Sequence, residues 1–256
     1  MSLEVLFVSL TLLAGTAGGS DPAAELAAQE PLHVVVATDP TFPPMEFLTE
    51  QNSLVGFDID LMRAIAQKAS LEIEFKMVSW DGIFEGLVSH EYDAIVSSVT
   101  ILPSRQEHLG FSRPYINAGQ SLATRASDGD VTSLGDLSGH PVGAQADTSG
   151  AQIAQDQPGV KVVLFDDIDE LFRALVDGKV DGVVVDLPVV SQYVNNPKFQ
   201  GALRLAAGPL NTEEYGIVFA RENRALLDRV NRALDLLKAD GELDRLLAKW
   251  SLKPRN

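Results

Sequence analysis

Polar and aromatic side chains that follow predicted strands form a set able to bind a small charged molecule. Arg105, with nearby hydroxyl groups and helix N–H groups, makes an anion receptor. Asp186, directly after the apolar run 183–185, makes a cation receptor, and Phe42 and Trp80 supply aromatic faces. A zwitterion that carries a side chain fits this combination. The complete candidate set is Asp39, Phe42, Trp80, Ser97, Ser98, Thr100, Arg105, Gln145, Thr148, Ser149 and Asp186.

Each of these residues also has a structural interpretation. Arg105 alone is typical of a helix surface, although its place shortly after a strand end favours a ligand. Asp186 can serve as the N-cap of the next helix and can do both. Trp80 and Phe42 are equally compatible with the core, because most Trp side chains are largely buried. Asp39 can be a turn residue, which makes its ligand role the weakest of the set.

The elements that must position these residues alternate between strand and helix. Buried or alternating apolar runs predict the strands, and apolar residues at helical spacing predict the helices. The predicted strands are 33–38, 71–78, 94–99, 121–124, 141–145, 161–165, 183–186 and 215–220. The predicted helices are 57–70, 81–90 with Asp81 as N-cap, 149–156, 168–176, 187–195, 223–239 and 242–251. This order predicts an α/β fold with mostly parallel sheets and helices on both faces, where ligands bind beyond the carboxyl ends of the strands.

Composition and missing motifs exclude several other functions. The 256 residues hold 20 Lys plus Arg against 36 Asp plus Glu, a net charge of −16, which argues against a nucleic-acid partner. Without cysteine there is no disulfide, thiolate metal site or Cys nucleophile. The four His are scattered, which makes a zinc site unfavourable, and no Gly-x-Ser-x-Gly, P-loop or Gly-x-Gly-x-x-Gly motif occurs. We therefore expect no cofactor and no metal.

The first residues are typical of an exported protein. Residues 5–17 are apolar and then small, which suits the core of a signal peptide but is too short to span a bilayer. Thr16 stands where a lipoprotein signal would carry its lipidated cysteine. Residues 18–31 read as a loose linker, and no later run reaches 18 apolar residues, so we expect a soluble mature protein.

Several stretches follow one another in a fixed order along the chain. They are DPTFPPMEF (39–47), VGFDIDL (55–61), WDGIFEGL (80–87), YDAIVSSVTILPSR (92–105), FSRPY (111–115), VGAQADTS (142–149), GKVDGVVVDLP (178–188), YGIVFAR (215–221) and LLKADGELDRLLAKW (236–250). In this order they resemble the bacterial extracellular solute-binding proteins of the polar amino-acid uptake group. Each stretch alone is weakly specific, but the ordered set covers about residues 32–252 and is strong.

The resemblance implies a two-lobed type II periplasmic-binding-protein fold, with two mostly parallel doubly wound sheets joined by two hinge strands that close over a ligand. It implies lobe 1 at 32–120 and 213–256 and lobe 2 at 121–212, after a signal peptide and linker at 1–31. It also implies a monomer in the periplasm that binds a free L-amino acid and delivers it to an ABC transporter permease in the inner membrane.

The resemblance further assigns roles to the charged and hydroxyl residues. Arg105 matches the arginine that forks onto the ligand α-carboxylate, and Thr100 and Ser149 match its hydroxyl and backbone helpers. Ser98 and Asp186 match the positions that meet the α-ammonium group. Two departures concern the loops: Ser104 precedes Arg105 where an acidic residue is usual, and Asp147 replaces a glycine, although Asp tolerates a left-handed backbone better than most residues.

The remaining matches concern the side chain of the ligand. Phe42 and Trp80 match the aromatic walls, while Asp39 and Gln145 sit where family members contact the tip of the ligand side chain. Asp39 between two aromatic faces favours a basic or polar ligand, such as arginine, lysine, histidine or glutamine.

Two alternatives stay open. Cyclohexadienyl dehydratases use a similar scaffold to eliminate water and CO2 from prephenate or arogenate, but Asp186 would repel a dicarboxylate such as prephenate. A sensor domain that signals through a kinase is the other alternative, which the end of the sequence at Asn256 without a transmembrane helix disfavours.

Overall fold

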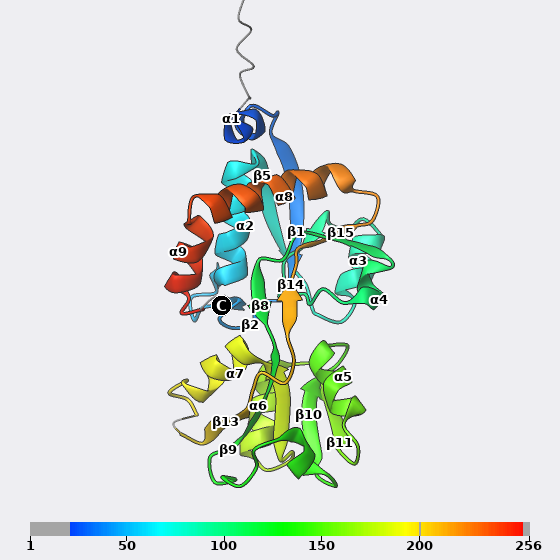
Figure 1. Ribbon diagram of the computed structural model, residues 1–256, viewed down its shortest axis with the longest axis vertical. Coiled ribbons are helices and arrows are strands. Elements are labelled where there is room, and N and C mark those ends of the chain that lie inside the picture. Colours follow the sequence, from blue (N-terminus) through cyan, green and yellow to red (C-terminus); the bar gives the residue numbers. More distant parts are fainter. Residues whose placement is uncertain (1–20, 200, 253–256) are drawn as a thin grey trace, which may run out of the picture.

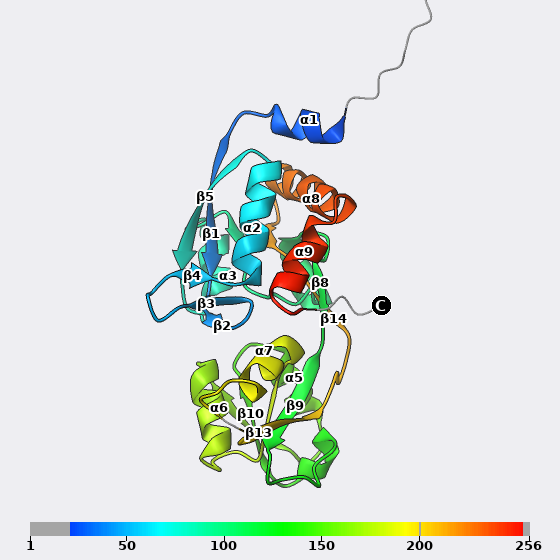
Figure 2. The same ribbon diagram turned by 90° about the vertical axis from the view of Figure 1, so that its left-hand side faces the viewer.

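The computed structural model describes residues 21–199 and 201–252, which form two lobes joined by extended segments (Figure 1, Figure 2). The expected signal peptide and Thr16 lie outside the described residues. Each lobe contains a five-stranded sheet. Among the helices of the described part, none is long and apolar enough to cross a membrane.

The sheet of lobe 1 combines parallel and antiparallel strands. The strand order is β5 (Leu71–Met77), β1 (Leu32–Thr38), β6 (Ala94–Ile95), β15 (Val218–Ala220) and β7 (Leu109–Phe111). Strand β1 runs parallel to both of its neighbours, whereas β15 runs antiparallel to both of its own. The carboxyl ends of β1 and β6 therefore lie at the same edge of the sheet, which faces lobe 2.

Helices cover both faces of this sheet because alternate residues of its strands are apolar on both sides. Val34 and Val36 of β1 pack in the cluster formed with α2 (Phe57–Lys68), α8 (Arg224–Ala239) and α9 (Glu242–Lys249). Ala37 packs on the opposite face in the cluster formed with α3 (Ile83–Val88). The other elements of this lobe are α4 (Pro103–Gln106) and a small sheet of β2 (Thr41–Phe42), β3 (Glu46–Leu48) and β4 (Leu54–Val55).

Lobe 2 repeats this plan with a second mixed sheet. The strand order is β11 (Lys161–Phe165), β10 (Pro141–Gln145), β12 (Gly182–Asp186), β9 (Gln120–Arg125) and β13 (Leu203–Ala207). Val183 and Val185 of β12 pack with α6 (Ile168–Val176) and α7 (Leu187–Val194), while Val184 packs on the other face with α5 (Ser149–Asp156) and the 3₁₀ helix η1 (Leu134–Leu137). All five residues of β12 are buried, as expected for a strand covered on both faces.

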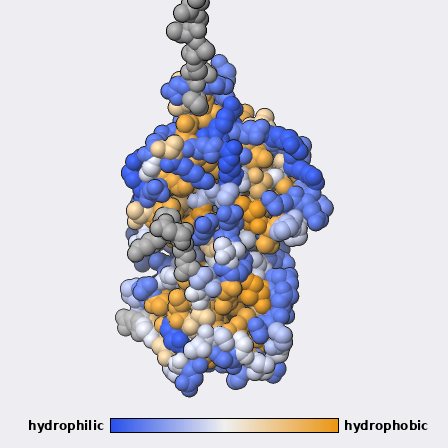
Figure 3. Space-filling model, viewed as in Figure 1, coloured by the Kyte–Doolittle hydropathy of each residue, from blue (hydrophilic) through white to orange (hydrophobic). Residues whose placement is uncertain are grey.

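Two extended segments connect the lobes. Strands β8 (Ile116–Ala118) and β14 (Glu213–Tyr215) pair antiparallel between the lobes, and β8 continues into β9 while β14 continues toward β15 (Figure 1). Hydrophilic residues cover much of the outer surface of both lobes in the same view, and hydrophobic residues show between the elements (Figure 3).

The α/β class and the two lobes are confirmed. In each sheet four of the five strands run in one direction. The remaining strand, β15 or β9, runs the opposite way because it enters the sheet directly from a crossing segment. Strands β7, β8 and β13 and the small sheet of β2, β3 and β4 were not predicted, and most of these strands are short.

Two predicted strands differ from the observed ones. The run 94–99 is paired only at Ala94–Ile95, after which the chain bends toward lobe 2, with Ser98 at a φ of 50°. The run 215–220 is divided between β14, which pairs with β8, and β15, which pairs inside lobe 1. In both places the backbone leaves the regular sheet at the boundary between the lobes.

Helix starts and the linker also differ in part from expectation. Asp81 does not cap α3: its N-cap is Gly82, with a φ of 81°, and no side chain completes that cap. Thr148 caps α5 and Asp167 caps α6, each by accepting a backbone N–H. The supposed loose linker contains the helix α1 (Pro22–Ala27), whose Leu26 is buried in the core of lobe 1.

Candidate ligand-binding site

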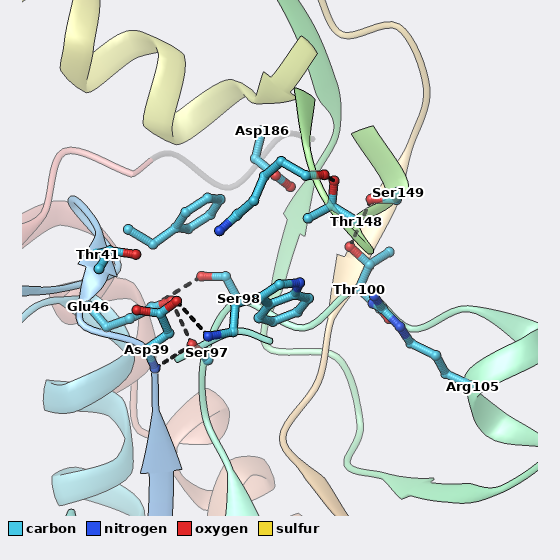
Figure 4. A pocket seen from close by; sticks show the side chains of 13 residues that line it. Asp39, Thr41, Glu46, Ser97, Ser98, Thr100, Arg105, Thr148, Ser149 and Asp186 are labelled. Atoms are coloured by element: carbon cyan, nitrogen blue, oxygen red, sulfur yellow. Dashed lines mark hydrogen bonds between the residues drawn. The ribbon is translucent and has the colours of Figure 1, made fainter. Parts of the chain in front are cut away.

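All eleven candidate residues line a single pocket between the lobes, together with Thr41 and Glu46. The space between the lining atoms, counted together with the open solvent at the mouth of the pocket, is about 390 Å³. Figure 4 shows Asp186, Thr148 and Ser149 on one side and Asp39, Ser97 and Ser98 on the opposite side. Arg105 lies at one end of this view, and Thr41 lies at the other end with Glu46 and Asp39. The pocket therefore has a cationic end and an acidic end.

Arg105 lies on the short helix α4 and reaches toward lobe 2. Its Nη1 donates to the Thr100 carbonyl at 3.2 Å, and its Nη2 donates to the Asp147 carbonyl of lobe 2 at 3.0 Å. Because a guanidinium has five N–H donors, these two bonds leave others for a ligand. The group lies over the rings of Trp80 and Phe84, and burial lowers its pKa. A half-buried guanidinium with N–H donors left over is a receptor for a carboxylate.

Asp186 ends β12 on the lobe 2 side of the pocket and is buried. Its Oδ1 accepts the Tyr215 hydroxyl at 2.5 Å, and burial, followed by the charge of Glu213, raises its pKa to about 6. Although Asp186 occupies the N-cap position of α7, its side chain makes no cap hydrogen bond. The structure therefore leaves this carboxylate directed at the pocket and not at the helix.

The start of α5 supplies backbone N–H groups to the pocket. The Thr148 hydroxyl accepts the Ala151 N–H at 3.1 Å and donates to the Gln145 carbonyl at 2.7 Å, so it is occupied within its own loop. The N–H groups of Ser149 and Gly150, at the first positions of α5, have no partner within the helix. Asp147, which replaces the family glycine, adopts the left-handed backbone at a φ of 57°.

Buried acids support the loop of Ser97 and Ser98. The Ser97 and Ser98 hydroxyls donate to the two oxygens of Glu46 at 3.1 and 3.2 Å, and the Ser98 N–H donates to Asp58 at 2.7 Å. Tyr115 also donates to Asp58, at 2.9 Å. Burial raises the pKa of Asp58 to about 6, and burial with the Asp58 charge raises the pKa of Glu46 well above its usual range.

Asp39, Gln145 and the aromatic residues complete the pocket. Asp39 accepts the Trp80 N–H at 2.9 Å, and burial raises its pKa. Gln145 uses its amide nitrogen on the Asp166 carbonyl at 3.0 Å, which leaves its oxygen as an acceptor. Phe42 packs against core clusters of both lobes, and Trp80 packs edge-on against Phe84, so both are part of the core as well as the pocket wall.

The sequence analysis did not single out Glu213, whose carboxylate connects the lobes. It lies behind the pocket on β14 and accepts hydrogen bonds from Thr100 and Ser149. No local pattern indicates this role, because residues 100, 149 and 213 approach each other only in the folded chain. Glu46 accepts hydrogen bonds from Ser97 and Ser98 and also lines the pocket. Within the described residues, no group of three or more His, Asp or Glu side chains is arranged to hold a metal ion.

The bacterial extracellular solute-binding proteins, family 3, match residues 34–253, and the chain belongs to this family. The ABC transporter arginine-binding protein 1 of Escherichia coli (strain K12) is 32% identical over 217 residues, which cover 82% of this chain and 87% of that protein. An ancestral arginine-binding protein bound to glutamine shares 38% identity and a TM-score of 0.81, covering 85% of this chain and 97% of that one. An ancestral amino acid-binding protein, a precursor of cyclohexadienyl dehydratase, shares 32% identity and a TM-score of 0.78, with coverages of 85% and 94%. These findings confirm the resemblance and the two-lobed fold.

Proposed function

We propose that this protein binds a free L-amino acid between its lobes and delivers it to the permease of an ABC importer. The observation that carries the proposal is that one pocket is lined by a half-buried cation, Arg105, and by a buried acid, Asp186. The two charged groups complement the carboxylate and the ammonium group of an amino acid. The arginine-binding relative and the glutamine-bound ancestral structure support the same class of ligand.

The proposed α-carboxylate site consists of Arg105 and the N-terminal N–H groups of α5. The free guanidinium donors supply charge and a forked geometry, while the Ser149 and Gly150 N–H groups supply donors without intrahelical partners. The proposed α-ammonium site is Asp186, with Ser98 on the opposite wall. A ligand held in this way contacts both lobes and favours their closed arrangement.

The proposed ligand has a basic or polar side chain, such as that of arginine, lysine, histidine or glutamine. Asp39 and the free oxygen of Gln145 both accept hydrogen bonds, and Phe42 and Trp80 offer faces for a flat or cationic tip. An apolar side chain would leave these acceptors without partners, at about 1–3 kcal/mol each.

We propose that the protein works as a monomer in the periplasm and performs no chemistry. The description of the family as extracellular solute-binding proteins supports the location outside the cytoplasm, and the relative described as an ABC transporter arginine-binding protein supports a binding role. The alternative is a cyclohexadienyl dehydratase-like enzyme, which the similarity to the ancestral precursor keeps open. The buried Asp186 carboxylate disfavours a dicarboxylate substrate because it would repel the second anion.

A thermal-shift screen with the twenty amino acids tests this function. A ligand at one hundred times its dissociation constant stabilises the folded state by about 2.7 kcal/mol, which gives a clear rise in melting temperature. We expect the largest rise with a basic or polar amino acid. No rise with any amino acid, or turnover of prephenate by the purified protein, would contradict the proposal.

A further inference from the structure

Glu213 is a buried acid that gathers donors from both lobes. Its Oε2 accepts the Thr100 hydroxyl of lobe 1 at 2.9 Å and the Ser149 hydroxyl of lobe 2 at 2.8 Å. The amide of Gln120 donates to the same oxygen at 3.4 Å, and the Asn211 amide donates to Oε1 at 2.6 Å. Only 7% of Glu213 is exposed, so these groups and not water satisfy its carboxylate.

The direction of these hydrogen bonds decides what the two hydroxyls can offer to a ligand. A carboxylate only accepts, and a hydroxyl group has one hydrogen. Thr100 Oγ1 and Ser149 Oγ lie 3.4 Å apart, whereas Glu213 Oε2 lies 2.9 and 2.8 Å from them, so each hydroxyl directs its hydrogen at the closer and charged Glu213. Ser149 Oγ additionally accepts the Gln120 amide at 3.1 Å. Both hydroxyls line the pocket, and toward it they present lone pairs and no hydrogen.

We infer that Glu213 is a positioning residue: it fixes the hydroxyl hydrogens so that Thr100 accepts a hydrogen bond from the ammonium group of the ligand. This inference rests on the proposed function. It changes the role that the resemblance implied for Thr100, because a hydroxyl without a free hydrogen cannot assist a carboxylate. The carboxylate is then left to Arg105 and the N–H groups of α5.

The surroundings of Glu213 support this arrangement. The charge of Glu213 acts on both receptors: it contributes to the raised pKa of Asp186 and counteracts the lowered pKa of Arg105. A negative carboxylate behind Thr100 also adds to the attraction for a cationic group in front of it. Glu213 and Asp186 therefore act on the ammonium group from two sides.

The Glu213→Gln variant reverses the hydrogen bonds that Thr100 and Ser149 make to residue 213. The side-chain oxygen of Asn211 accepts the backbone N–H of Gln120 at 2.9 Å. The side-chain nitrogen of Asn211 therefore stays a donor toward position 213. A glutamine must then direct its own oxygen at Asn211 and its NH2 group at the hydroxyls. Thr100 and Ser149 become acceptors of that NH2 group, and their hydrogens turn toward the pocket and the ammonium group.

Titration calorimetry with L-arginine and L-glutamine tests this inference. We expect Glu213→Gln to weaken binding about 10- to 100-fold, the usual range for a hydrogen bond to a charged group. Glu214→Gln is the matched control, since Glu214 is the exposed neighbour on the same strand, and we expect less than a twofold change. Thr100→Val should match the loss of Glu213→Gln, and the double variant should lose no more than Thr100→Val alone.

Different outcomes separate the inference from the proposed function. Unchanged affinity in Glu213→Gln, or losses that multiply in the double variant, would overturn the positioning role. Failure of the wild-type protein to bind any amino acid would instead overturn the proposed function, and the inference with it. If Glu213→Gln does not fold, neutron diffraction of the deuterated wild-type protein replaces it: we expect deuterium between Thr100 Oγ1 and Glu213, and deuterium directed at the pocket would refute the inference.

Discussion

Burial shifts the pKa values of Arg105 and Asp186, the two residues proposed to bind the backbone groups of the ligand, in opposite directions. Burial lowers the pKa of Arg105 and raises the pKa of Asp186 to about 6, so each charge is less favourable here than in water. An amino acid restores the lost partners, since its carboxylate and ammonium groups pair with these charges. The residues that contact the ligand backbone should therefore contribute to affinity for every amino acid, whatever its side chain.

Replacing Arg105 by alanine should remove the carboxylate receptor. We expect affinity for all amino acids to fall about 30- to 5,000-fold, because truncating one partner of a buried charge pair costs about 2–5 kcal/mol. Titration calorimetry measures this loss. Arg113→Ala is the control, since Arg113 is an exposed partner of Asp235. An Arg105→Ala variant that keeps wild-type affinity would disprove the carboxylate role.

Asp186 should make binding dependent on pH. Its folded pKa of about 6 lies above its ordinary value of 3.8, so the free protein holds a proton on Asp186 below about pH 6. An ammonium ligand needs the ionised form, and affinity should therefore fall about tenfold for each unit below pH 6 and stay level between pH 7 and 8. Asp186→Asn should bind weakly and lose most of this dependence. Equal affinity of the wild-type protein at pH 5 and pH 7.5 would contradict this.

The raised pKa of Asp186 also predicts how the free energy of unfolding changes with pH. The sign is opposite to that of an acid whose pKa is lowered by a salt bridge. A raised folded pKa means that the folded protein binds this proton more tightly than the unfolded chain. The contribution of Asp186 to the free energy of unfolding should therefore decrease as pH rises from about 4 to about 6. Asp186→Asn should flatten this part of the denaturation profile, which urea unfolding at several pH values would measure.

At the scale of elements, local patterns predicted helices better than strands. Helices α5 and α6 have the predicted bounds because their caps, Thr148 and Asp167, and their apolar faces are encoded locally. Strands β2, β4 and β6 have two residues each, too few for a periodic pattern. Pairing with the nearby β3 defines β2 and β4, and pairing with the distant β1 and β15 defines β6. The candidate residues nevertheless came together, because most of them follow strands whose carboxyl ends meet at the boundary between the lobes. Glu213 was missed because its bonds depend on the meeting of three distant segments.

The backbone at Gly56 packs closely against the backbone of Met45 and Glu46, so a substitution there tests whether this close packing is required. Gly56 begins α2 with a φ of 140°, and a Cβ there would lie 2.0 Å from the Met45 carbonyl oxygen. We expect Gly56→Ala to lower the free energy of unfolding by at least about 3 kcal/mol, because the obstructing atoms are backbone. The start of α2 also positions Asp58, and the adjacent strand β3 positions Glu46, where both contact Ser97 or Ser98.

Gly82→Ala is the matched control in the same denaturant experiment. Gly82 also precedes a helix with a positive φ, but no atom lies within 4 Å of the added Cβ. We expect only the cost of a left-handed residue, about 1–2 kcal/mol. Equal effects of the two substitutions would show that the close approach at Gly56 does not matter.

At the scale of the whole molecule, the structure has both lobes in contact through polar groups. Arg105 donates to the Asp147 carbonyl across the boundary, and Glu213 holds a hydroxyl from each lobe. We propose lobe boundaries at 120/121 and 212/213, because the crossing strands β8 and β14 lie beside these positions. The net charge of −16 is consistent with a carrier that prefers ligands with a cationic group.

Titration calorimetry of the wild-type protein with arginine, lysine, histidine, glutamine and leucine tests the central claim most directly. The structure predicts one L-amino acid bound per chain, with the tightest binding by one of the four basic or polar ligands. Leucine leaves Asp39 and Gln145 without partners, so it should bind at least about tenfold more weakly. Tightest binding of leucine would contradict the proposed side-chain site, and no heat of binding with any of the five would contradict amino-acid binding itself.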